Sequence, residues 1–152
     1  MGAEGNTVQD SPAETMSLDK VEDLLEAARF DDIQEIMSLA STVSLDSKDS
    51  QGRTALHMAS ANGHLDIVEY LVCRGVDLNA PNEEMNTPLH WACLNGHVEV
   101  VKKLIFAGAN VSVLNSYEKS PIDEAVSGEK MDVIDAINEA VAQVELTGIR
   151  VS

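Results

Sequence analysis

Aromatic and basic side chains are scarce in this chain of 152 residues. Aromatic residues make up 3%, so the 44% of residues that are hydrophobic are mostly Leu, Val, Ile, Ala and Met. Small aliphatic side chains at helical spacing suit thin, stacked helices. Ten Lys and Arg stand against 26 Asp and Glu, which gives a formal net charge of −16 and a pI of about 4.3. A surface of that sign repels nucleic-acid phosphates and anionic lipids, so we expect neither nucleic acid nor a membrane as a direct partner.

Cysteine and long apolar runs are equally rare. The two cysteines, Cys73 and Cys93, have no metal-ligand spacing and occupy non-equivalent positions, so we expect neither a metal site nor a disulfide bond. Reduced thiols fit a cytoplasmic or nuclear location. The first ten residues lack the basic and apolar segments of a secretory signal. The sequence also contains no run of about 18 apolar residues, the length that predicts a membrane span.

What the chain does contain is one 33-residue pattern written twice, between residues 49 and 114. A shift of 33 positions superimposes ten identical residues without a gap. The motif residues are Thr54, Leu56, His57 and Gly63 in the first copy, and Thr87, Pro88, Leu89, His90 and Gly96 in the second. Self-similarity at a fixed period is typical of a stacked repeat protein, in which each unit buries its apolar face only against its neighbours.

Each copy predicts a turn followed by two helices. Gly52 suits the turn because it adopts a positive φ without steric cost. Thr54 is expected to cap a helix over residues 55–62, which Gly63 ends. A second helix is expected over residues 65–74. The next copy repeats this plan, with Pro88 at the first helical position, where its missing N–H costs nothing.

Weaker copies flank the central pair. In the first, Asp19 and Glu22 resemble a capping box, Leu24 takes the place of Leu56, and Met37 belongs to an apolar helical stripe. In the last, Ser120 and Asp123 replace Thr and His, and a final helix is expected over residues 131–144. The predicted domains are a disordered acidic tail (1–16), a repeat domain (17–145, with units 17–48, 49–81, 82–114 and 115–145) and a C-terminal tail (146–152).

The stretch from Thr87 to Ala92 reads Thr-Pro-Leu-His-Trp-Ala, which matches the Thr-Pro-Leu-His-x-Ala signature of ankyrin repeats, as does the period of 33. Residues 54–59 match with Ala in place of Pro. The chain therefore resembles the ankyrin-repeat family. The resemblance implies an all-α solenoid of about four helix–turn–helix units, two well formed and two degenerate caps. It also implies a non-catalytic module that binds another protein and needs no cofactor.

In ankyrin repeats, partners are contacted by the loop tips and by the inner face of the first helix of each unit. The resemblance places these contacts at Ser50, Gln51, Arg53, Asn62, Glu83, Glu84, Asn86, Trp91, Leu94, Asn95, Tyr117 and Lys119. Two tips carry Met85 and Glu118 where the family has Gly. Because a positive φ strains such residues, we expect these tips to be reshaped.

Several side chains allow two interpretations. Four histidines at repeat-equivalent positions invite a zinc or catalytic role, but a structural role repeated with the unit is favoured. Trp91, the only tryptophan, is expected to pack against a neighbouring helix more than to act as a binding hot spot. No nucleophile–base motif or phosphate-binding glycine loop occurs, so no enzymatic activity is predicted. An enzyme would require a deep polar pocket, which a narrow helical array rarely has.

Negative charge is concentrated at the two ends. Residues 1–46 carry a net −9, residues 47–117 a net −2 and residues 118–152 a net −5. Polar caps and solubility explain part of this. The alternative is that a monomeric chain binds a basic partner through its acidic ends. In this it would be similar to the ankyrin-repeat chaperones, known in yeast, that escort a basic small-subunit ribosomal protein. A competing hypothesis is a regulatory inhibitor or adaptor that docks on an enzyme or transcription factor through the central repeats.

Overall fold

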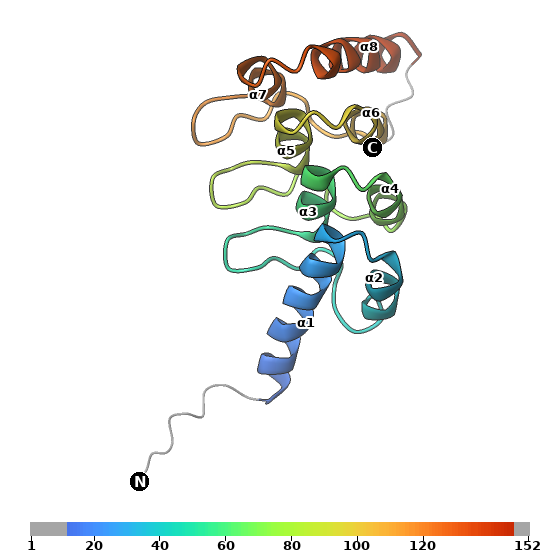
Figure 1. Ribbon diagram of the computed structural model, residues 1–152, viewed down its shortest axis with the longest axis vertical. Helices are drawn as coiled ribbons and strands as arrows, with labels where there is room; N and C mark the ends of the chain where they lie inside the picture. Colours follow the sequence, from blue (N-terminus) through green and yellow to red (C-terminus); the bar gives the residue numbers. More distant parts are fainter. Residues whose placement is uncertain (1–11, 148–152) are drawn as a thin grey trace.

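The structure is a computed structural model that describes residues 12–147 (Figure 1). Within that range it contains eight helices and no strand. The helices are α1 (Pro12–Arg29), α2 (Ile33–Leu39), α3 (Ala55–Asn62), α4 (Leu65–Cys73), α5 (Pro88–Leu94), α6 (Val98–Ala107), α7 (Pro121–Ser127) and α8 (Met131–Thr147). The all-α solenoid expected from the repeat pattern is therefore confirmed.

The helices form four pairs that stack along the long axis of the molecule. In Figure 1, α1, α3, α5 and α7 form one row and α2, α4, α6 and α8 form the other. Within the first row α3 packs between α1 and α5, and α5 packs against α7; in the second, α6 packs between α4 and α8. The loops between pairs form three hairpins that project from the side of the first row. We call the surface formed by that row and the hairpin tips the inner face.

The central helices begin where the sequence predicts and end within one residue of the expected position. Thr54 caps α3: its Oγ1 accepts from the His57 backbone N–H at 3.3 Å, and its own N–H donates to His57 Nδ1 at 3.2 Å. Gly63 ends α3 with a φ of 74°. The same reciprocal cap recurs at the start of α5 and, with Ser120 and Asp123, at the start of α7. Helix α4 ends at Cys73, one residue before the expected end.

Each capping histidine also ties its unit to the next one. His57 Nδ1 accepts a hydrogen bond from the Thr54 backbone N–H, so Nε2 carries the ring hydrogen and donates to the Asn86 carbonyl oxygen at 2.8 Å. His90 Nε2 donates in the same way to the Lys119 carbonyl oxygen at 2.9 Å. The imidazoles therefore link each inner helix to the base of the following hairpin.

The ends of the array differ from the sequence prediction. Helix α1 begins at Pro12, five residues before the expected unit, because Pro is well tolerated in the first turn of a helix. Asp19 therefore lies inside α1 and is not its cap. Met37, expected on the apolar stripe of α2, is 45% exposed. Helix α8 continues to Thr147, past the expected end at Val144. The remainder of the two predicted tails, residues 1–11 and 148–152, lies outside the described residues.

The core is a continuous column of aliphatic side chains. Leu24, Leu56 and Leu89, which occupy the same place in three successive units, are each at most 2% exposed. Ile122 takes that place in the last unit and is only partly buried, because no further unit covers it. Repetition in the sequence thus becomes a repeated buried layer, as expected when each unit packs only against its neighbours.

Candidate partner-binding face

The three hairpin tips share one hydrogen-bond pattern. The residue that opens each tip is Asp49, Asn82 or Asn115, and its Oδ1 accepts two backbone N–H groups further along the tip. Its own N–H donates to a carbonyl oxygen four residues on, which closes the loop. These side-chain turns fix the tip backbone before any partner binds, which lowers the entropy cost of binding.

The tips of the second and third hairpins keep this shape without glycine. Gly52 has a φ of 77°, and the equivalent residues Met85 and Glu118 have φ values of 64° and 61°. The prediction that these tips would be reshaped is therefore wrong. The hydrogen bonds to Asn82 and Asn115 stabilise each turn and offset the strain of a positive φ.

Neighbouring tips are also bonded to one another. The Glu83 N–H donates to the Gln51 carbonyl oxygen at 3.0 Å, and the Ser116 N–H donates to the Glu84 carbonyl oxygen at 2.8 Å. Below the tips, Asn115 Nδ2 donates to Asn86 Oδ1 at 2.9 Å. The tips therefore form a rigid, evenly spaced edge of the inner face.

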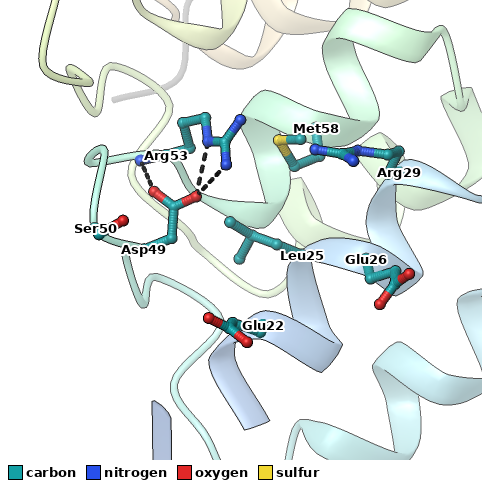
Figure 2. A pocket seen from close by; sticks show the side chains of 8 residues that line it. All are labelled: Glu22, Leu25, Glu26, Arg29, Asp49, Ser50, Arg53 and Met58. Carbon is teal, nitrogen blue, oxygen red and sulfur yellow. Dashed lines mark hydrogen bonds and ion pairs between the residues drawn. The ribbon is translucent and has the colours of Figure 1, made fainter. Parts of the chain in front are cut away.

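A pocket of about 290 Å³ opens on the inner face where α1 meets the first hairpin (Figure 2). Its lining comes from three elements that are distant in the sequence. The lining residues are Glu22, Leu25, Glu26 and Arg29 from α1, Asp49, Ser50 and Arg53 from the hairpin, and Met58 from α3. Leu25 and Met58 are buried and form an apolar floor, whereas Glu22 and Glu26 are exposed on the wall.

One ion pair closes the hairpin side of this pocket. Arg53 donates from Nε and Nη2 to Asp49 Oδ2, both at 2.7 Å, as the dashed lines in Figure 2 show. Burial by itself would raise the pKa of Asp49, but hydrogen bonds from Arg53 and from the Gln51 backbone outweigh it and hold the pKa below its ordinary value. Asp49 thus stays ionised and neutralises Arg53.

A second pocket, of about 360 Å³, lies between the first and second tips. It is lined by Gln51, Arg53, Asn82, Glu83, Glu84 and Trp91. Trp91 is half-buried, and its ring meets the ring of His57 edge-on, with centroids 5.2 Å apart and planes at 71°. Trp91 therefore packs against α3 as expected, and its role as a binding hot spot stays a prediction. Arg53 lines both pockets, so they adjoin.

Burial keeps two titratable side chains of the core in their neutral forms. Burial lowers the pKa of His57 to about 4, despite the favourable hydrogen bond to Asn86. Burial likewise raises the pKa of the Cys93 thiol to about 12. His57 is therefore neutral and Cys93 protonated, and neither is poised as a base or nucleophile. Across residues 12–147 no three His, Cys, Asp or Glu side chains are grouped so as to hold a metal ion.

Comparison with known proteins agrees with this geometry. A family model described as "Ankyrin repeats (3 copies)" matches residues 24–115 and 81–140, which together span most of the chain. This chain belongs to the ankyrin-repeat family. Ankyrin repeats are in general non-catalytic modules for protein–protein interaction, so the chain is a module for binding protein partners. The match supports the ankyrin family and does not support the finer similarity to the yeast chaperones.

One curated relative is the mitochondrial liver isoform of glutaminase from Rattus norvegicus. It is 43% identical to this ankyrin chain over 53 residues, which are 34% of the chain and 9% of the glutaminase. The chain thus matches only a small part of that relative, its ankyrin region, and the likeness concerns the repeat and not the glutaminase reaction. In the described part of the chain, no helix is both long and apolar enough to cross a membrane.

The predicted contact residues do not all lie free on the ankyrin surface. Eight are exposed: Ser50, Gln51, Asn62, Glu83, Glu84, Leu94, Asn95 and Tyr117. Two of these have internal bonds, because Asn62 donates to the Met58 carbonyl oxygen and Asn95 to the Ala61 carbonyl oxygen. Arg53 and Lys119 are half-buried, and Lys119 Nζ donates to Ser127 Oγ at 3.0 Å. Partner binding by the exposed set stays a prediction.

Asn86 needs a correction. It is 8% exposed, its carbonyl oxygen accepts from His57, and its side chain accepts from Asn115. Its backbone N–H is bonded to Asn82 as well. Asn86 therefore holds the hairpins together and is not the exposed contact residue that the sequence predicts.

Sequence reasoning missed the part of the inner face that α1 forms. Glu22, Leu25, Glu26 and Arg29 are absent from the predicted contacts, although their spacing of three, four and seven residues places them on one side of a helix. Met58 is absent from them as well, and it is buried at the floor of the pocket. The spacing along α1 was the signal that could have indicated this wall of the pocket.

Proposed function

We propose that this ankyrin-repeat chain binds a basic segment of a partner protein along its inner face and acts as an acidic escort for that partner. The observation that carries the proposal is the state of the carboxylates on the inner face. Glu22, Glu26, Glu83 and Glu84 are all exposed. Over the described residues, the ion pairs within 4.0 Å are Arg53 with Asp49 and His64 with Asp31, so these four glutamates are left available to a cationic partner.

The distribution of charge over the whole chain also favours a basic partner that lies along the inner face. The first 46 residues carry a net −9 and contribute α1, which forms one end of the inner face. Such a field speeds the association of a basic partner and disfavours nucleic acid. It also opposes the stacking of a second copy, whose ends carry the same sign, so the proposal includes a free chain that is monomeric. A cytoplasmic or nuclear location belongs to the proposal too, supported by the two unpaired cysteines.

A second candidate is a regulatory adaptor that docks through the central and C-terminal tips. Leu94 and Tyr117 are 41% and 66% exposed on that part of the inner face. Tyr and Trp are frequent at the energetic centres of interfaces. In that case apolar contact would carry the affinity and added salt would change it little.

The test is affinity purification with the tagged chain, followed by measurement of the affinity for the captured protein at two salt concentrations. The proposal expects a basic protein whose binding weakens at least about tenfold between roughly 0.05 and 0.5 M salt, because exposed charges are screened. The matched variants are Glu83→Gln with Glu84→Gln, against Leu94→Ala with Tyr117→Ala. Salt-independent binding that only the second pair weakens would replace the escort by the adaptor.

A further inference from the structure

We infer that the pocket between α1 and the first hairpin tip receives an arginine side chain of the partner segment. This inference rests on the proposed function, because it names the group that the inner face recognises. The pocket has the size for a single side chain, at about 290 Å³. It is built by α1, the hairpin and α3 together, so only the folded array presents it.

The floor of the pocket fits the aliphatic part of such a side chain. Leu25 and Met58 are buried and face the opening from α1 and α3. Arginine places its methylene stem against apolar surface while keeping its charged head in contact with water or acids. An acidic or small polar side chain would leave that floor uncovered.

The wall of the pocket supplies the charge. Glu22 and Glu26 lie one turn apart on α1, where two like charges repel each other. The carboxylate of Asp49 is already taken by Arg53 and by two backbone N–H groups. Glu22, Glu26 and Arg29 are therefore the lining charges without an ion-pair partner over the described residues, which leaves the pocket with a net negative charge. A cation placed beside the two glutamates relieves their repulsion.

The position of Arg29 sets the direction in which the side chain enters. Glu22 and Arg29 are seven residues apart on α1, about 10 Å along the helix axis. Figure 2 shows Arg29 at the Met58 end of the pocket and Glu22 at the opposite end. A guanidinium is drawn to the Glu22 end, where its planar fork can engage a carboxylate through two hydrogen bonds, which the single ammonium of lysine cannot do.

The partner chain then continues toward the second tip. Arg53 lines both this pocket and the one between the first two tips. Beyond Arg53 the surface presents Glu83 and Glu84 beside the half-buried Trp91. A second cationic side chain of the same segment has acidic groups to meet there.

The inference is tested by titrating the ¹⁵N-labelled chain with three blocked hexapeptides that carry two arginines, two lysines or two glutamines at the same positions. With the arginine peptide we expect backbone amide shifts centred on residues 22–29 and 49–53. We expect Glu22→Gln with Glu26→Gln to weaken its binding about fivefold at roughly 0.05 M salt. The matched control is Asp135→Asn with Glu139→Gln, which makes the same charge change one turn apart on the exposed side of α8 and should leave the affinity within about twofold.

The outcomes separate this inference from the proposed function. Equal affinity for the lysine peptide overturns the assignment to arginine. Amide shifts spread equally over α8, or a Glu22 and Glu26 variant that binds like the wild type, overturn the pocket. If that variant still captures the basic partner with unchanged affinity, the escort role stands and the pocket inference fails. If the wild type captures no basic partner, the proposed function fails whatever the peptides do.

Discussion

The two central helix pairs and the pair at the C-terminal end have the same backbone but are built from different residues. In the centre, Thr54 and Thr87 cap their helices together with buried histidines that reach the next unit. At the end, Ser120 and Asp123 form the same cap, but Asp123 is exposed and reaches no further unit. The cap is retained because it is local, whereas the bridging contact is absent because the described residues include no following unit for it to reach.

The turns between paired helices show the same contrast. Gly63 and Gly96 have φ values of 74° and 81°, and the equivalent residues of the terminal units, Asp31 and Glu129, have φ values of 63° and 58°. The terminal units therefore adopt the left-handed turn without the residue that makes it inexpensive. Packing of each helix pair fixes the turn, and the terminal units carry the strain.

The largest difference between central and terminal units is expected when equivalent core side chains are truncated. Leu89→Ala should lower the free energy of unfolding by roughly 2–5 kcal/mol, because Leu89 is 1% exposed between two neighbouring units. Ile122→Ala, at the same place in the half-covered terminal unit, should cost clearly less. Urea denaturation followed by circular dichroism measures both. Equal midpoints for the two variants would show that the terminal layer is as tightly packed as the central one.

How much the sequence predicts depends on the same distinction between centre and ends. The bounds of α3 follow from the sequence because Thr54 and Gly63 are strong start and stop signals. The start of α1 at Pro12 does not, because residues 12–16 have no apolar periodicity and resemble a tail in composition. The exposure of Met37 could not be predicted either. It depends on whether another part of the protein packs against the first unit, and a local sequence pattern does not contain that information.

Only part of the candidate site could be predicted from the sequence, namely the part that the repeat determines. The hairpin tips follow from the repeat, so their exposed residues could be named in advance. The pocket of Figure 2 joins four residues of α1 to Met58 of α3, which lies about thirty positions further along the chain, and its opening depends on how the two helices pack. Burial of Asn86 is also a tertiary effect, because it results from bonds to His57 and Asn115 in neighbouring units.

A smaller effect is expected from acid, and it should arise in the centre of the array. The folded-state pKa of His57 is about 4, against 6.5 for an unperturbed histidine. As the pH falls below 6.5, His57 therefore takes up a proton in the unfolded chain but stays neutral in the folded chain. The stability that depends on neutral His57 is complete above pH 6.5 and is lost progressively toward pH 4, by roughly 2–3 kcal/mol.

Two measurements check this acid effect. Titration of the His57 ring by NMR should give a pKa near 4 and not near 6.5. The loss of stability between pH 7 and pH 4.5 should be smaller in His57→Gln than in the wild type, since glutamine takes up no proton. Asp49 and Asp123 do not confuse the result, because their pKa values lie below 3.8 and their contribution is lost only at lower pH. An identical acid loss in both proteins would assign it to other groups.

The smallest effect tests whether the terminal turns are strained. Glu129→Gly should raise the free energy of unfolding by about 0.5–1 kcal/mol. A residue with a Cβ costs roughly 1–2 kcal/mol in the left-handed conformation, and the greater backbone freedom of glycine in the unfolded chain cancels part of the gain. Glu129→Gln keeps the Cβ while removing the charge, so it should change little. The converse substitution, Gly96→Ala, should destabilise the equivalent central turn, where the added Cβ would meet only the flexible end of Lys130 at 3.3 Å. If Glu129→Gly gained nothing while Gly96→Ala lost stability, the terminal turn would be relaxed by its surroundings, and the central and terminal units would differ in energy as well as in sequence.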